Sequence, residues 1–154
     1  MRRRKARELA LKMLYQMEVN REAAGAALER YVKIFPYEED IVSYTRFLLD
    51  GVTRKQRNLD RFIVAASEHW KIGRITYVDR NILRVAIFEM LYSPEVPPKV
   101  AIDEALELAK KFGTEDSKDF VNGILDRVLR DHYEKAEKTK DQDRQDPDAR
   151  GIDS

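Results

Sequence analysis

The side chains best suited to chemistry in this chain stand among its first residues. Arg2, Arg3, Arg4, Lys5 and Arg7 form a cationic run at the start of a segment with helical spacing. Guanidinium groups match phosphate oxygens in a bidentate geometry, and several cations together give binding that weakens with salt. The run therefore indicates an anionic partner, with nucleic acid as one reading and a solubilising, frayed terminus as the other.

Aromatic side chains near these cations could add base stacking. Tyr15 stands two helical turns after Arg7, so the two can share one face of a helix. Phe120 lies near Lys118 in the first turn of the last predicted helix. Single-stranded RNA is commonly bound by aromatic stacking combined with arginine contacts. A single aromatic residue is more often part of a hydrophobic core than of a binding site. The aromatic residues therefore only add support to the interpretation of the cationic run.

Four charged residues interrupt the most apolar segment of the chain, residues 77–93, namely Asp79, Arg80, Arg84 and Glu89. Asp79 stands near its start, where a carboxylate suits the helix dipole, and Arg80 and Arg84 follow. These residues could form an internal ion pair or a solvated stripe, or they could form a polar site on a rigid element. We favour the structural interpretation.

The sequence lacks the residues and motifs that most catalytic and cofactor-binding sites require. The chain has no cysteine, which excludes a disulfide framework, a thiol nucleophile, a cysteine zinc site and an iron–sulfur cluster. Its two histidines, His69 and His132, are far apart in sequence. Neither a phosphate-binding loop, nor a dinucleotide fingerprint, nor a nucleophile elbow occurs. We therefore expect no enzyme, no metal site and no cofactor.

Length, charge and hydropathy narrow the class of protein further. The chain has 154 residues, about one domain's worth, and a net charge of +1. Residues 1–12 hold six basic side chains against Glu8 alone, so this end carries +5 and the remainder about −4. No stretch approaches the roughly 18 apolar residues of a membrane span, and no apolar signal-peptide core follows the basic start. We expect a soluble, cytoplasmic protein.

Apolar residues recur at helical spacing almost throughout the chain, and no convincing strand pattern is present. The spacing predicts an all-α fold with short connections. Segment 77–93 is apolar on most sides, which is typical of a helix in the middle of a bundle. Gly123 stands inside the last predicted helix, where a close backbone contact would explain it. The seven predicted helices are 4–18, 22–35, 38–55, 57–69, 77–93, 98–112 and 114–136.

The apolar pattern stops at about residue 136. The charged run beyond it has Ile152 as its one strong apolar residue, so it cannot bury enough surface to offset its ordering entropy. We predict a helical domain over residues 1–136 and a disordered tail over residues 137–154.

Two long stretches of the sequence resemble a known family. The opening RRKARELALKMLYQ is similar to the first helix of the bacterial transcription antitermination factors of the NusB family. The stretch VDRNILRVAIFEMLYSPEVPPKVAIDEALELAKKFGTEDSKDFVNGILDRV resembles that family's carboxyl half almost without a gap. The resemblance covers about residues 2–130, and between residues 20 and 70 it rests mainly on the helical pattern.

This resemblance implies two small helical bundles packed across each other and a function without catalysis. A family member binds the single-stranded boxA element of nascent ribosomal RNA leader transcripts together with NusE, a protein of the small ribosomal subunit. The complex joins elongating RNA polymerase with other Nus factors and suppresses premature termination. The basic amino end and the Phe120 region are then expected to form one RNA surface, with NusE docked alongside.

The family's site residues can be placed on this sequence one by one. The RNA-binding positions are expected at Arg3, Arg4, Lys5, Arg7, Asp116, Lys118 and Phe120. The NusE-facing positions are expected at Tyr15 and Asp79. The chain departs from the family at Asp119, where lysine is common, and at Asp79, where glutamate is common.

Other interpretations stay open on the sequence alone. A NusB-like domain also occurs fused to ribosomal RNA cytosine methyltransferases, but nothing here supplies a methyl-donor site. A helical protein-binding adaptor with a solvated basic end would show no salt-sensitive RNA binding. A helix-turn-helix regulator would let DNA compete with boxA RNA.

Overall fold

The computed structural model describes residues 2–67 and 72–145, with side chains as far as residue 132. These residues form six α-helices and one short 3-10 helix, and no strand occurs among them. The all-α class is thereby confirmed. The helices are α1 (Arg2–Asn20), α2 (Ala24–Ile34), α3 (Glu39–Ala66), η1 (Ile72–Arg74), α4 (Tyr77–Tyr92), α5 (Pro98–Phe112) and α6 (Ser117–Gln145).

The largest differences between the predicted and the observed helices occur at two places. Segments 38–55 and 57–69 form the single helix α3, because Gln56 and its neighbours are good helix formers and no proline interrupts them. The helix α6 continues to Gln145, past the predicted end at residue 136, and six of the nine added residues are Glu, Lys, Gln or Arg, which favour helix. The rest of the predicted tail, residues 146–154, lies outside the described residues.

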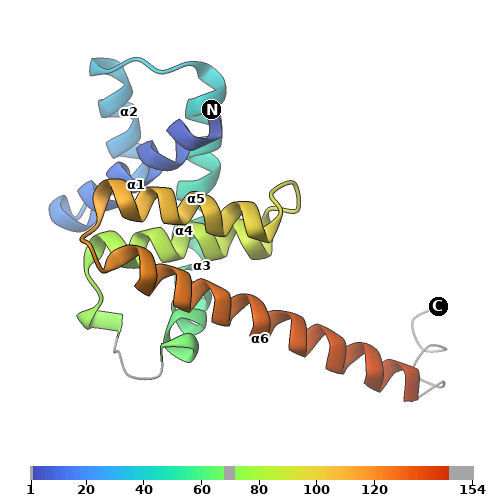
Figure 1. Cartoon of the computed structure of the whole chain (residues 1–154). Coiled ribbons are helices and arrows are strands. Elements are labelled where there is room, and N and C mark those ends of the chain that lie inside the picture. The colour runs from blue at the N-terminus through green and yellow to red at the C-terminus, as the bar shows by residue number, and fades with distance from the viewer. Residues whose placement is uncertain (1, 68–71, 146–154) are drawn as a thin grey trace, which may run out of the picture.

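The helices pack as two groups of three, α1–α3 and α4–α6 (Figure 1). Helix α4 contacts α5 and α6 within its own group and α1 and α3 across the interface between the groups. Its residues Ile82, Leu83 and Ile87 are fully buried. The prediction that residues 77–93 occupy the middle of the bundle is therefore confirmed.

Helix α4 begins where the chemistry of its first turn predicts. The Thr76 hydroxyl accepts a hydrogen bond from the backbone N–H of Asp79 at 3.3 Å, as an N-cap does. Asp79 is the acidic residue of this first turn, where the helix dipole favours negative charge. This turn lines two cavities, one through Tyr77 and Val78 and the other through Asp79.

A close contact at a glycine occurs at a position other than the predicted one. A Cβ added to Gly123 would meet no atom within 4 Å, so the contact expected there is absent from the described structure. A Cβ added to Gly51 on α3 would lie 2.0 Å from the Phe88 ring. The missing side chain of Gly51 therefore lets α4 approach α3.

Candidate nucleic-acid interface

The first two arginines of α1 are held by acids on other elements. Arg2 Nη1 donates to Asp40 Oδ2 at 2.7 Å, and Arg2 Nη2 also bonds Glu38 at the start of α3. Arg3 Nη2 donates to Glu95 Oε2 at 2.9 Å in the α4–α5 connection. All these partners are exposed, and exposed ion pairs contribute little to stability. Another anion could therefore replace the carboxylates without unfolding the protein.

Arg4 forms the most specific of these exposed pairs. Its Nε and Nη2 each donate to the carboxylate of Glu104 on α5, both at 2.9 Å. The hydrogen bond from Arg4 lowers the pKa of Glu104 below its ordinary value, against an opposing effect of burial. Lys5 is exposed and has no ion pair among the described residues. The Arg4 guanidinium is thus already oriented to donate two hydrogen bonds to one anionic group. Lys5 is accessible to an anion as well.

Arg7 differs from the other members of the cationic run because it is buried. Its Nε and Nη2 donate to Glu89 of α4 at 2.7 and 2.9 Å, and both side chains are almost inaccessible. The Tyr44 hydroxyl donates to the same carboxylate, and Arg7 also lies 3.6 Å from Glu104. The expectation that Arg7 belongs to the exposed RNA-binding set therefore conflicts with its position. The side chains of Arg3, Arg4 and Lys5 are exposed, whereas Arg7 points into the interface between α1 and α4.

The favoured structural interpretation of the polar residues on α4 is confirmed for Arg84. Its guanidinium donates to both Asp60 oxygens at 2.8 and 3.0 Å and to Glu18 at 3.2 Å. This network joins α1, α3 and α4. Arg80 instead lies over the Tyr77 ring, 4.8 Å from its centroid. Asp79 Oδ1 and Arg80 Nε are buried without a hydrogen-bond partner among the described groups, and of these two residues Asp79 lines a cavity.

The structure brings Asp79 together with two of the expected RNA-binding residues. Asp79 is buried, and its Oδ1 has no hydrogen-bond partner among the described groups. The cavity that it borders measures about 370 Å³ between the start of α4 and the start of α6. Lys118 and Asp119 are exposed and do not line it. The lining residues are Arg74, Ile75, Thr76, Asp79, Asp116 and Phe120.

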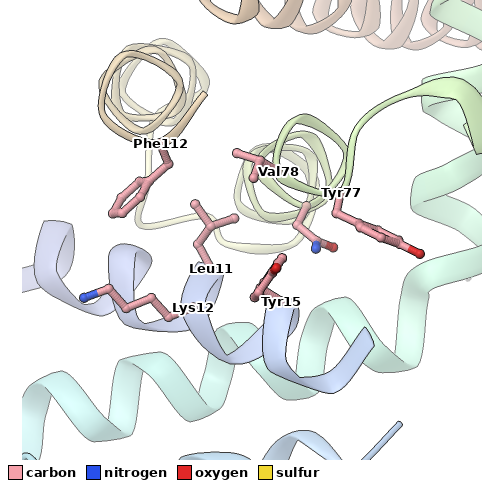
Figure 2. A pocket seen from close by; sticks show the side chains of 7 residues that line it. Leu11, Lys12, Tyr15, Tyr77, Val78 and Phe112 are labelled. Carbon is pink, nitrogen blue, oxygen red and sulfur yellow. The ribbon is translucent and has the colours of Figure 1, made fainter. Parts of the chain in front are cut away.

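Tyr15 lines a separate groove where α1, α4 and α5 meet (Figure 2). The groove measures about 240 Å³, and the Tyr15 side chain at its edge is half exposed. Its walls are mostly apolar, with Lys12 at one side. The two residues expected to face NusE, Tyr15 and Asp79, therefore line neighbouring cavities that share the first turn of α4. The groove is lined by Leu11, Lys12, Tyr15, Tyr77, Val78, Asn81 and Phe112.

The cationic end of α1 and the cavity of Phe120 do not form one hollow. Helix α5 runs between them (Figure 1), with Glu104 bonded to Arg4 in its middle and Lys111 in its last turn. Lys111 bonds Glu8 of α1 at 3.0 Å. A ligand that reaches both places must therefore lie along α5 and the adjoining face of α1.

Residues of α3 that the sequence did not single out complete the surroundings of the cationic end. Tyr44 and Phe47 line a cavity of about 480 Å³ with Arg2 and Arg3. Their spacing of three residues places them on one face of α3. The sequence signal was this pair of aromatic residues in a helix, but nothing local shows that the arginines lie beside them.

The chain matches the model of the NusB family over residues 4–130. It is 44% identical over 134 residues to the transcription antitermination protein NusB of Desulforudis audaxviator, covering 87% of this chain and 97% of that protein. It is 47% identical over 128 residues to the protein of the same name from Anaeromyxobacter dehalogenans, covering 82% and 89%.

Solved structures show the same fold. NusB of T. maritima superposes with a TM-score of 0.77 at 38% identity, covering 83% of this chain and 90% of that one. A chain from a crystal structure of the antitermination factors NusB and NusE in complex with double-stranded RNA superposes with a TM-score of 0.76 at 27% identity, covering 84% and 96%. Within the described part of this chain, no helix is long and apolar enough to cross a membrane.

Proposed function

This chain belongs to the NusB family, and from that premise we propose that it is a transcription antitermination factor. It binds single-stranded boxA RNA of ribosomal RNA leader transcripts together with NusE, and the complex promotes processive elongation by RNA polymerase in the cytoplasm. The names of its relatives support this role, and so does a structural neighbour solved with NusE and RNA. Its role is to bind and to assemble, without catalysis.

The observation that carries the proposal is the cationic end of α1, where the half-exposed Arg3 and Arg4 pair with carboxylates and the exposed Lys5 has no ion pair among the described residues. Arg3 and Arg4 bind RNA phosphates in place of Glu95 and Glu104, and the exposed Lys5 binds a further phosphate. Arg7 holds α1 against α4 through Glu89 and positions its neighbours. We propose residues 1–136 as the RNA-binding domain and residues 137–154 as a tail outside it.

The cavity at the start of α6 receives part of the RNA. Phe120 offers a ring for a base to stack on, and the carboxylate of Asp116 can accept a hydrogen bond from an amino group of a base. Lys118 is exposed beside them and contributes charge. The geometry supports an RNA path along α5 that joins this cavity to Arg4.

NusE binds at the groove of Tyr15. The half-exposed Tyr15 ring and the apolar walls can accommodate an apolar side chain of NusE. Lys12 can pair with an acidic residue of NusE beside it. Asp79 lies one residue after Val78 of this groove and also borders the cavity of Phe120. NusE and RNA are therefore bound next to each other across the first turn of α4.

The decisive experiment is fluorescence anisotropy of a labelled boxA RNA, titrated with and without NusE at two salt concentrations. The double variant Arg4→Ala with Lys5→Ala should weaken binding and flatten the logarithmic salt slope by roughly one unit or more, since each lost phosphate contact removes about 0.7. The matched control is Arg54→Ala with Arg57→Ala, which removes the same charge from an exposed part of α3.

Equal losses in both double variants would show that only net charge matters, and the proposed contacts would be wrong. A folded protein that binds NusE but shows no salt-sensitive RNA binding would support a protein-binding adaptor instead. Competition by duplex DNA at equal concentration would support a DNA-binding regulator.

A further inference from the structure

Four aromatic rings form a continuous row across α3 and α4 that the proposed function does not use. Two of them, Tyr44 and Phe47, belong to α3, and the other two belong to α4. Phe47 is the exposed member, with 42% of its surface accessible, whereas Phe88 is buried. The centroid distances are 5.7 Å for Tyr44–Phe47, 5.3 Å for Phe47–Phe88 and 5.7 Å for Phe88–Tyr92.

A glycine allows the rings of this row to pack closely. Gly51 stands one helical turn after Phe47, and its missing Cβ leaves the space that the Phe88 ring occupies. Phe88 therefore packs beneath Phe47 and supports it from the core side. The Phe47 ring is therefore already in position for stacking. A base that stacks on it would cost little side-chain entropy.

Cations stand at the end of the row that adjoins the amino end of α1. The Arg3 guanidinium lies 4.8 Å from the centroid of the Tyr44 ring. Arg2 and Arg3 line the cavity of about 480 Å³ beside Phe47, and the exposed Ser43 adds a hydroxyl group. Asp40 also lines this cavity and is bonded to Arg2. Arg3 is the more available cation, because its partner Glu95 is 79% exposed.

We propose that this cavity binds one nucleotide of the single-stranded RNA that flanks the boxA element. The base stacks on Phe47, the phosphate replaces Glu95 on Arg3, and the Ser43 hydroxyl donates to a phosphate oxygen. The inference rests on the proposed function and extends the RNA path from Arg4 over the amino end of α1 onto α3.

Charge and continuity favour a nucleotide over a protein side chain as the occupant. The cavity joins two arginines to an aromatic face, which is the combination that single-stranded nucleic acid requires. It also shares Arg3 with the proposed phosphate contacts, so one strand could reach both. Stacking accepts any base, so the site would add affinity and length dependence without reading the sequence.

The test compares a boxA RNA with the same RNA extended by a few nucleotides at one end or the other, using full-length protein. A fluorescent adenine analogue in the extension reports stacking through loss of emission. For the wild-type protein, one of the two extensions should raise the affinity and quench the analogue. Phe47→Leu should remove about fivefold or more of that gain and abolish the quenching, with the affinity for the short RNA unchanged.

The matched control is Phe35→Leu, the same change at another exposed ring at the end of α2. Phe47→Trp should restore both the gain and the quenching, because it keeps a stacking face. Thermal unfolding of each variant shows that the fold is retained.

Binding of the short RNA without any gain from either extension would overturn this inference and leave the proposed function standing. A gain and a quench that persist in Phe47→Leu would overturn it as well. If the wild-type protein bound neither RNA, the proposed function itself would fail. Displacement of the extension by an acidic peptide, with no quenching, would assign the cavity to a protein partner.

Discussion

Arg7 and Glu89 form a bidentate ion pair across the interface of α1 and α4, with donor–acceptor distances of 2.7 and 2.9 Å. The two residues are separated by 82 positions in sequence, and both are buried. The pair divides the cationic run of α1 into exposed members that can meet a ligand and one member that orients the helix. Several expected outcomes depend on this division.

Breaking the buried pair should destabilise the protein strongly. Arg7→Met or Glu89→Gln leaves one buried charged group without its partner, which costs about 3–5 kcal/mol. The double variant Arg7→Met with Glu89→Leu removes both charges and should recover much of that loss. Urea unfolding followed by circular dichroism measures the free energy of unfolding. A single Arg7 variant that is as stable as Arg4→Ala would contradict the structural role.

Removing the acid that holds Arg4 should strengthen RNA binding. Glu104→Gln keeps the shape of the side chain but removes the charge that competes with phosphate, so the affinity should rise by up to about fivefold. The matched control is Glu107→Gln, which removes a carboxylate that bonds Lys110 at 3.4 Å and acts on Arg4 through its charge but not through a hydrogen bond. Anisotropy titration at constant salt measures both. Equal gains would point to net charge as the cause.

The same pair should affect stability at acid pH. The hydrogen bond from Arg4 lowers the pKa of Glu104 in the folded state. The ionised Glu104 therefore contributes to the free energy of unfolding above its pKa in the unfolded chain. This contribution is lost as the pH falls through the pKa of Glu104 in the folded protein. Glu104→Gln should therefore lose less stability than the wild-type protein over that acid range. Unfolding curves at a series of pH values below neutrality would show the difference, and parallel curves would contradict it.

Tyr44 should make stability sensitive to alkaline pH. Burial, helped by the hydrogen bond to Glu89 and by its charge, raises the pKa of Tyr44 to about 12. Because this pKa is raised, the protonated Tyr44 hydroxyl contributes fully to the free energy of unfolding below the ordinary tyrosine pKa near 10. The contribution disappears as the pH rises towards about 12. Tyr44→Phe should be less stable at neutral pH and decline less between these limits. Denaturation at alkaline pH tests this, with Tyr15→Phe as the exposed control.

Two glycines in helices should respond in opposite directions to alanine. At Gly51 the added Cβ would lie 2.0 Å from the Phe88 ring, and such overpacking costs about 1–3 kcal/mol. At Gly123 the added Cβ would meet nothing within 4 Å, and alanine should stabilise the helix by about 0.5–1 kcal/mol. Thermal unfolding of the two variants measures the shifts. Destabilisation at both positions would show that the space around Gly123 is not free.

Partner binding and RNA binding should separate at the two cavities of α4. Tyr15→Ala removes the ring from the groove and should weaken NusE binding, with RNA binding by the protein alone unchanged. Phe120→Leu removes the stacking face from the other cavity and should show the reverse pattern. Co-elution with NusE and anisotropy with boxA RNA measure the two activities. Loss of both activities in either variant would mean that the cavities act as one site.

Much of the architecture is local and could be predicted from the sequence. The helical period of 3.6 residues depends only on residues that are close together in the sequence. The helices, the central position of α4 and the all-α class therefore follow from the spacing. The division into helices was wrong around residue 56, because the apolar faces of two adjoining segments do not show whether the helix continues between them. The last helix also extends to Gln145, past the predicted end at residue 136, where the apolar pattern had stopped. The predicted family positions at Asp116 and Phe120 also lie in one cavity.

The roles of individual charges depended on the tertiary structure. Arg4 and Arg7 stand three residues apart in one basic run, and nothing local shows that Glu104 meets the first at the surface while Glu89 meets the second in the core. Asp79 likewise joins Asp116 in a cavity, although 37 residues separate them in sequence. Sequence spacing determines which way a side chain points from its own helix, but the groups that it meets, and hence its exposure and its energy, are determined only when distant helices pack together.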